Sequence, residues 1–178
     1  MKELKELMLR KPRLTLAVAE SITCGRLQAQ IGAIAGASEF FLGGITPYLI
    51  SQKVRHLGVD RALAEATGGV SREVTEQLAK GACALFGSDL GLATTGWAEP
   101  VFERGIAHPV GYWALAHRRP DNSLVQRHGR IERSGATRVQ MQEAVAAAAL
   151  AALVEYLREL RRYSPVAEGG VREIRLGL

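Results

Sequence analysis

A serine lies where a buried strand gives way to a helix, and a hydroxyl in such a turn can do chemistry. Residues 19–25 are Ala-Glu-Ser-Ile-Thr-Cys-Gly. The first turn of a helix leaves backbone N–H groups unpaired, so the Ser21 hydroxyl beside them could act as a nucleophile, or the turn could bind an anion. Serine and threonine are also the most frequent N-caps, so Ser21 or Thr23 could instead cap the helix. The segment by itself favours the cap and leaves the nucleophile open.

The sequence on either side of this turn predicts the elements that position it. Residues 14–19 form a short apolar run typical of a buried strand, and apolar residues return at helical spacing over residues 23–34. Residues 39–48 are predicted to be extended, and Pro47 puts that segment at a sheet edge or outside the sheet. Residues 89–95, an apolar run bounded by glycines, predict a central strand that is covered on both faces.

Helix start and stop signals predict most of the remaining elements. Asp60 and Ser71 are good N-caps, and Gly87 is a good helix terminator. With these signals we expect helices over residues 3–9, 51–57, 60–69, 72–86 and 137–161.

A hairpin signal indicates that the sheet is mixed. Residues 120–123 are Pro-Asp-Asn-Ser, and they separate two strand-like segments at residues 110–117 and 124–131. Before them, the irregular residues 96–109 are predicted to cross the mouth of the sheet, where loops often hold ligands. Strands that alternate with helices are typical of an α/β fold.

The length of 178 residues suits one well-buried domain, which we assign to residues 1–163. Residues 164–178 are predicted to be a tail, and the alternation at residues 171–176 predicts a strand that is added to a sheet edge or exchanged with a partner subunit. Because that tail and the alanine-rich final helix could both bury area against a copy of the chain, we expect a homodimer.

The composition excludes several classes of partner. The net charge of +5 comes from basic residues near the start of the chain and over residues 118–138, without interleaved aromatic residues, so we do not expect a nucleic-acid partner. That positive field would equally suit a small phosphorylated substrate. The longest apolar run, residues 144–154, is shorter than the roughly 20 residues of a spanning helix, so no membrane association is expected.

The cysteines and histidines predict neither a disulfide nor a metal site. Cys24 and Cys83 are far apart, and no signal-peptide pattern precedes them, so we expect a reducing, cytoplasmic location. The histidines have no ligand-like spacing and stand at His56, His108, His117 and His128.

Four segments of the chain match, in order, the motifs of one known family. The family motif Ala-Glu-Ser-x-Thr-Gly-Gly agrees with residues 19–25 at six of seven positions. A glycine-led segment at residues 41–45 is followed by Tyr48, Lys53 and Leu-Gly-Val at residues 57–59, as in the family. The family's Gly-x-Val-Ser segment is matched around residues 69–71.

The fourth match is Thr-Gly-x-Ala-x-Pro at residues 95–100, with Pro-Val-Gly at residues 109–111, and the resemblance runs in order from residue 14 to residue 157. The chain thus resembles the CinA C-terminal-domain family, the nicotinamide mononucleotide deamidases. The resemblance implies a three-layer α/β/α sandwich on a mixed, mostly parallel sheet. It also implies a hydrolase that cleaves the carboxamide of nicotinamide mononucleotide and releases ammonia, without a cofactor or metal.

The resemblance implies a catalytic serine at Ser21 and a catalytic lysine at Lys53. A serine hydroxyl needs a base to remove its proton, and a desolvated lysine can be that base. Thr23 and the N–H groups around it would bind the developing oxyanion, and Tyr48 would position substrate or share the proton relay. Other residues of the matched segments are expected to bind substrate, namely Gly25, Gly43, Gly44, Gly96, Trp97, Glu99 and Arg138.

Each of these residues also has a structural interpretation. Taken alone, Lys53 would be a solvated surface charge, and Tyr48 a half-buried residue at the sheet edge. Glu20 follows a buried strand, so we expect it to brace the turn rather than to react.

The chain departs from the family where substrate would bind. Leu49 and Ile50 stand where the family has Ser-Asn, and Cys24 replaces a glycine, where its side chain could crowd the pocket. In residues 96–104 two glutamates and two aromatic residues replace a glycine-rich loop, and carboxylates there would repel a phosphate. An arginine before the last helix is lost, and Arg138 could substitute for it.

Two hypotheses follow. In the first, Ser21 and Lys53 hydrolyse an amide, on nicotinamide mononucleotide or on a smaller and less anionic carboxamide. In the second, the fold persists as a binding or regulatory protein without turnover.

Overall fold

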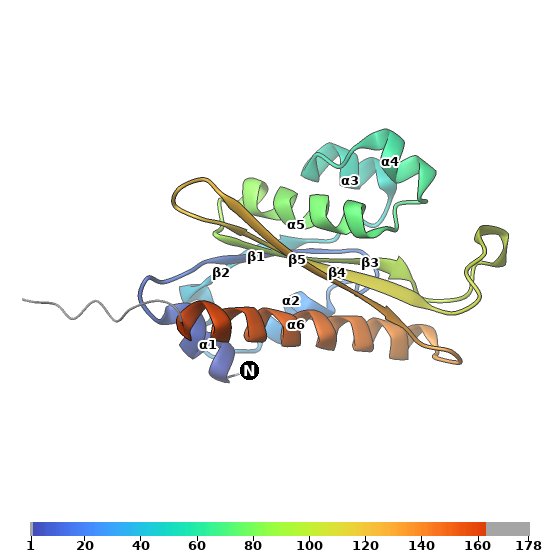
Figure 1. Cartoon of the computed structure of the whole chain (residues 1–178). Coiled ribbons are helices and arrows are strands. Elements are labelled where there is room, and N and C mark those ends of the chain that lie inside the picture. Colours follow the sequence, from blue (N-terminus) through green and yellow to red (C-terminus); the bar gives the residue numbers. More distant parts are fainter. Residues whose placement is uncertain (1, 163–178) are drawn as a thin grey trace, which may run out of the picture.

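The computed structural model describes residues 2–162, and within them a five-stranded sheet lies between two layers of helices (Figure 1). The strands are β1 (Leu16–Glu20), β2 (Phe41–Ile45), β3 (Leu90–Trp97), β4 (Val110–Arg118) and β5 (Leu124–Glu132). The α-helices are α1 (Lys2–Leu9), α2 (Arg26–Gly32), α3 (Ile50–Leu57), α4 (Arg61–Ala66), α5 (Arg72–Phe86) and α6 (Arg138–Arg162). Two short 3-10 helices are η1 (Ala37–Glu39) and η2 (Phe102–Arg104).

The sheet is mixed, as the hairpin signal predicted. Its strand order is β2-β1-β3-β4-β5, and β1 runs parallel to both of its neighbours. Only β4 points the other way, because it is antiparallel to both β3 and β5. Four of the five strands therefore share one direction, which agrees with the expected mostly parallel sheet.

The two faces of β1 belong to different halves of the core. Leu16 and Val18 pack with α1, α2 and α6 on one side of the sheet, while Ala17 and Ala19 pack with α3, α4 and α5 on the other. Figure 1 shows these two helix layers below and above the sheet. The small residues on the second face let α5 approach closely, and a Cβ atom at Gly91 would lie 2.0 Å from the Ala79 carbonyl oxygen. The expected three-layer α/β/α sandwich is confirmed.

Most predicted elements are present, with shifted ends near the serine turn. The helix expected from residue 23 begins at Arg26, because residues 22–25 form a turn that ends at Gly25, with a φ of 95°. The extended segment at residues 39–48 narrows to β2, an edge strand that ends before Pro47. The predicted strand at residues 171–176 lies outside the described residues. None of the helices within residues 2–162 is both long and apolar enough to cross a membrane.

The connections bring the ends of three parallel strands together. The chain crosses from β1 to β2 on one side and later to β3 on the other side of β1. In open α/β sheets, ligands bind at the carboxyl ends of strands where the order reverses in this way. Ser21 directly follows β1, Tyr48 follows β2, and Gly96 and Trp97 end β3.

Candidate active site

Ser21 is held at the end of β1 by the neighbouring strand. Its backbone N–H donates to the Thr94 carbonyl oxygen of β3 at 3.0 Å, and its side chain is buried. The sheet therefore fixes the backbone that carries the hydroxyl.

Glu20, rather than Ser21 or Thr23, satisfies the start of α2. One carboxylate oxygen accepts from the Gly25 and Leu27 N–H groups, both at 3.0 Å, and the other accepts from the Gln28 N–H at 2.9 Å. The side chain is fully buried, and no residue at the cap position supplies a side-chain hydrogen bond. The interpretation of Ser21 or Thr23 as the N-cap is therefore wrong, and Glu20 braces the turn as expected. The Ser21 hydroxyl is left available.

Lys53 lies in α3 with its amine buried beside Ser21. The side chain is 2% exposed, and its Nζ lies 2.9 Å from Ser21 Oγ and 2.9 Å from the Tyr48 carbonyl oxygen. No ion pair joins it to a carboxylate of residues 2–162. Burial alone lowers the pKa of the Lys53 amine from its ordinary 10.5 to about 8. The interpretation of Lys53 as a solvated surface charge is wrong.

A glycine turn lies over the stem of Lys53. Gly69 has a φ of 75°, and a Cβ atom there would lie 3.0 Å from Ile50 Cγ1 and 3.8 Å from Lys53 Cδ. The Thr95 hydroxyl donates to the Gly69 carbonyl oxygen at 2.9 Å, which ties this turn to β3. The turn thus helps to exclude water from the lysine, which is the cause of its lowered pKa.

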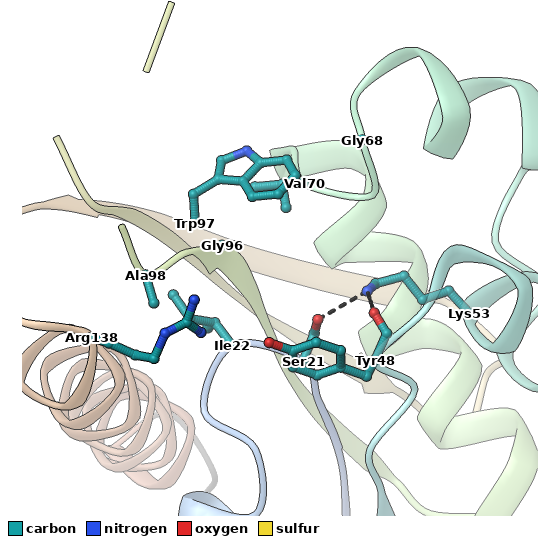
Figure 2. A pocket seen from close by; sticks show the side chains of 10 residues that line it. All are labelled: Ser21, Ile22, Tyr48, Lys53, Gly68, Val70, Gly96, Trp97, Ala98 and Arg138. Carbon is teal, nitrogen blue, oxygen red and sulfur yellow. Dashed lines mark hydrogen bonds between the residues drawn. The ribbon is translucent and has the colours of Figure 1, made fainter. Parts of the chain in front are cut away.

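These groups line one hollow of about 160 Å³ (Figure 2). Its lining residues are Ser21, Ile22, Tyr48, Lys53, Gly68, Val70, Gly96, Trp97, Ala98 and Arg138. In Figure 2, Lys53 and Arg138 approach from opposite sides, and Trp97 lies above Ser21 and Tyr48. Typical ligand pockets measure about 300–1,000 Å³, so this hollow fits the reacting end of a substrate whose remainder lies at the rim.

The structure brings six of the predicted site residues to this hollow, namely Ser21, Tyr48, Lys53, Gly96, Trp97 and Arg138. Sequence reasoning missed four of its lining residues, which are Ile22, Gly68, Val70 and Ala98. The matched segments around residues 69–71 and 95–100 contained or adjoined most of them, and that proximity was the available signal.

The other predicted substrate-binding residues do not line the hollow. The Thr23 hydroxyl is buried and bonded to Glu20 and Thr94, at 2.6 and 2.7 Å, so the structure contradicts a role for that hydroxyl in holding the oxyanion. Gly25 ends the turn before α2. Gly43 and Gly44 serve close packing, because Cβ atoms there would meet Phe86 and Val18, respectively, at 3.0 and 2.5 Å.

Tyr48 contributes its backbone to the lysine and its ring to the rim. Its carbonyl oxygen accepts from Lys53, while its side chain is 54% exposed. Arg138, the first residue of α6, forms an ion pair with Glu99, which itself does not line the hollow. The Glu99 hydrogen bond raises the pKa of the Arg138 guanidinium, and the nearby Tyr48 side chain acts in the same direction.

Cys24 has a backbone conformation that explains why the family motif has a glycine at this position. Its φ of 50° is in the left-handed region, which glycine adopts without steric cost. The Cys24 side chain is exposed and does not line the hollow. The expectation that it crowds the pocket is therefore wrong. Within residues 2–162, no group of three or more acidic, histidine or cysteine side chains could hold a metal ion.

The arrangement can activate a hydroxyl. A neutral amine donates to one neighbour and accepts from another, so Lys53 can donate to the Tyr48 carbonyl and accept the Ser21 proton at 2.9 Å. The resulting oxygen nucleophile faces a hollow that mixes apolar walls with few polar groups.

Comparisons with known proteins agree with this fold. The family model of the CinA C-terminal domain matches residues 1–157. A CinA-like protein of Chlorobium limicola is 37% identical over 155 residues, which cover 86% of this chain and 36% of that protein, so this chain spans about a third of that relative. The crystal structure of a competence-damaged protein (CinA) superfamily protein from Enterobacter cloacae superimposes with a TM-score of 0.78 at 25% identity, and the match covers 88% of this chain and 89% of that one. A competence or damage-inducible protein from Enterobacter asburiae gives 0.77 at 26% identity over 88% and 94% of the two chains.

Proposed function

The chain belongs to the family of CinA C-terminal domains, and from that membership we propose that it is an amidohydrolase in which Ser21 and Lys53 cleave a substrate carboxamide. The observation that carries the proposal is the 2.9 Å contact between the buried Lys53 amine and the Ser21 hydroxyl. Nicotinamide mononucleotide, the substrate that the family resemblance implies, is the first compound to test, together with smaller carboxamides.

In the first half-reaction, the neutral Lys53 amine takes the Ser21 proton while Oγ forms a bond to the carbonyl carbon of the carboxamide. The resulting ammonium of Lys53 then gives that proton to the amide nitrogen, the carbon–nitrogen bond breaks, and ammonia leaves. The substrate's acyl group remains as an ester on Ser21. The same amine therefore acts first as base and then as acid.

In the second half-reaction, water attacks the ester carbon and Lys53 takes a proton from it. The bond between the carbon and Ser21 Oγ breaks, the proton returns to Oγ, and the product leaves as a carboxylic acid that ionises in water. Each half-reaction passes through a tetrahedral oxyanion, which backbone N–H groups can stabilise. The N–H group of Ile22 suits this role, because Ile22 lines the hollow and its N–H has no hydrogen-bond acceptor among residues 2–162.

Ammonia release tests the proposal. The whole chain and its Ser21→Ala variant are compared on nicotinamide mononucleotide, nicotinamide riboside, nicotinamide and simple aliphatic carboxamides. We expect release from at least one compound, and its loss in Ser21→Ala. Ser38→Ala is the matched control, because Ser38 is exposed and lies in η1, away from the hollow. Absence of serine-dependent release from every compound would reject the amidohydrolase and leave a binding or regulatory protein.

A further inference from the structure

The rim of the hollow carries an ion pair between two half-exposed side chains. Arg138 Nη2 contacts Glu99 Oε2, and the two side chains are 48% and 59% exposed, respectively. Arg138 begins α6, whereas Glu99 follows β3, so the pair joins two elements that are distant in the sequence. The Tyr48 side chain lines the same hollow as Arg138.

An anionic substrate group in this hollow would bind at the positive charge of Arg138. Apart from Lys53, which is engaged with Ser21, it is the only cationic side chain among the ten lining residues. A phosphate bound within the hollow would therefore depend on Arg138, whereas the Arg104 guanidinium lies outside the lining, 5.7 Å from the centroid of the Trp97 ring. Glu99 already occupies the guanidinium, so a phosphate would have to displace its carboxylate or bind beside a like charge.

Part of the loop after β3 is closed on itself, which leaves four of its N–H groups unavailable to a phosphate. Residues 101–106 form a closed turn in which the N–H groups of Val101, Arg104, Gly105 and Ile106 all donate to carbonyl oxygens of the same turn. A phosphate cradle needs N–H groups that point together and remain unpaired. Figure 1 shows this segment, between β3 and β4, extending away from the sheet.

The walls of the hollow suit an apolar, planar body. Ile22, Val70 and Ala98 present aliphatic groups, and Trp97 presents an indole ring opposite Ser21 and Tyr48 in Figure 2. Such walls can hold an aromatic ring while its carboxamide reaches Ser21. They give no partner to a phosphate.

We infer that Glu99 makes this site selective for carboxamides whose body carries no phosphate, an inference that rests on the proposed amide hydrolysis. Glu99 does so by neutralising Arg138 at the rim. It is a specificity-determining residue and takes no part in the bond-breaking steps. A nucleoside or a simpler aromatic carboxamide meets no repulsion from it, whereas a nucleotide does.

Nicotinamide riboside and nicotinamide mononucleotide test the inference, because they differ only in the phosphate. We expect the whole chain to hydrolyse the riboside with a kcat/KM at least equal to that of the mononucleotide. Glu99→Gln should raise kcat/KM for the mononucleotide about fivefold, the scale of one exposed ion pair, and leave that for the riboside within twofold. Glu143→Gln is the control, because this glutamate of α6 is exposed, does not line the hollow and should change neither value.

Binding to the Ser21→Ala protein separates this inference from the proposed function. We expect Glu99→Gln in that background to tighten the mononucleotide about fivefold, with the riboside unchanged. If that holds while no carboxamide is hydrolysed, the specificity stands and the hydrolysis is rejected. A whole chain that prefers the mononucleotide, an unchanged preference in Glu99→Gln, an equal effect of Glu143→Gln, or binding of neither compound would overturn the inference.

Discussion

The Lys53 amine lies 2.9 Å from the Ser21 hydroxyl oxygen and has no carboxylate partner among residues 2–162. An ammonium in this position has three protons to donate, but within the described part of the chain only the Ser21 hydroxyl and the Tyr48 carbonyl accept from it. A neutral amine matches the same two neighbours fully, because it can accept the serine proton. Loss of the proton from Lys53 and activation of Ser21 are therefore coupled.

Substitutions at Lys53 should separate its basicity from its charge. Lys53→Met and Lys53→Arg are both expected to lower kcat about 1,000-fold, because methionine has no basic nitrogen and a guanidinium stays protonated. Ammonia release from the best substrate measures the rate, and circular dichroism reports whether each variant is folded. Lys80→Met, at an exposed lysine of α5, is the control and should keep full activity. Substantial activity in Lys53→Met would remove Lys53 from the mechanism.

The rate should rise with pH as Lys53 loses its proton. The pKa of its amine is lowered by burial to about 8, so the reactive neutral form increases through that pH. We expect kcat/KM to rise about tenfold between pH 7 and pH 9 and then to level off. The rate of the Ser21→Ala variant is subtracted at each pH to remove uncatalysed hydrolysis. A profile that is flat or falls over this range would contradict a lysine base.

The same burial should make the folding stability depend on pH. The pKa of Lys53 is about 8 in the folded chain and 10.5 as the ordinary value, so between these pH values the unfolded chain binds more protons. The free energy of unfolding therefore rises as pH increases from about 8 to about 10.5, because the folded chain no longer has to bury a charged amine. Below pH 8 this penalty, the cost of burying the charged Lys53, is fully present. Its size is about 3 kcal/mol at pH 7.

Lys53→Met should relieve that penalty. We expect the variant to be more stable than the parent chain at pH 7 in urea unfolding, and this advantage to shrink towards pH 10. Comparing the two proteins at each pH cancels the titration of the other groups. An advantage that stays constant with pH would mean that Lys53 has the same pKa in the folded and unfolded chains, which would contradict a pKa lowered by burial.

Local signals in the sequence were enough to predict most helices and strands. Asp60 and Ser71 cap α4 and α5 as expected, with side-chain oxygens that accept from the N–H groups of Leu63 and Val74 at 2.7 and 3.1 Å. Gly87 ends α5 in the left-handed conformation that a terminator requires. Each of these interactions lies within a few residues, so one short segment contains all of the necessary information.

Which residues line the hollow depends on contacts between distant segments, and no short segment of the sequence encodes these contacts. Gly43 and Gly44 belong to a matched motif, yet they are glycines because a side chain there would collide with Phe86 and Val18, respectively. The sheet and α5 bring those two residues close, although they are distant in the sequence. Glu99 was expected to contact substrate, but its position opposite Arg138 depends on how α6 packs against the loop after β3. A sequence motif gives the residue types, whereas the register of distant elements decides which side chains point into the hollow.

Glu20 is expected to position Ser21 through the turn that it braces. In Glu20→Gln, the amide has one acceptor oxygen where the carboxylate uses two, so hydrogen bonds to Thr23, Gly25, Leu27 or Gln28 are lost. We expect a loss of stability of about 2 kcal/mol and a lower kcat with little change in KM, because the hydroxyl is displaced while the walls of the hollow remain.

The midpoint of the pH profile of Glu20→Gln should stay near that of the parent chain, since Lys53 keeps its burial. Glu143→Gln, at an exposed glutamate of α6, is the control and should alter neither property. Full stability with unchanged kcat in Glu20→Gln would show that the turn holds Ser21 without the carboxylate.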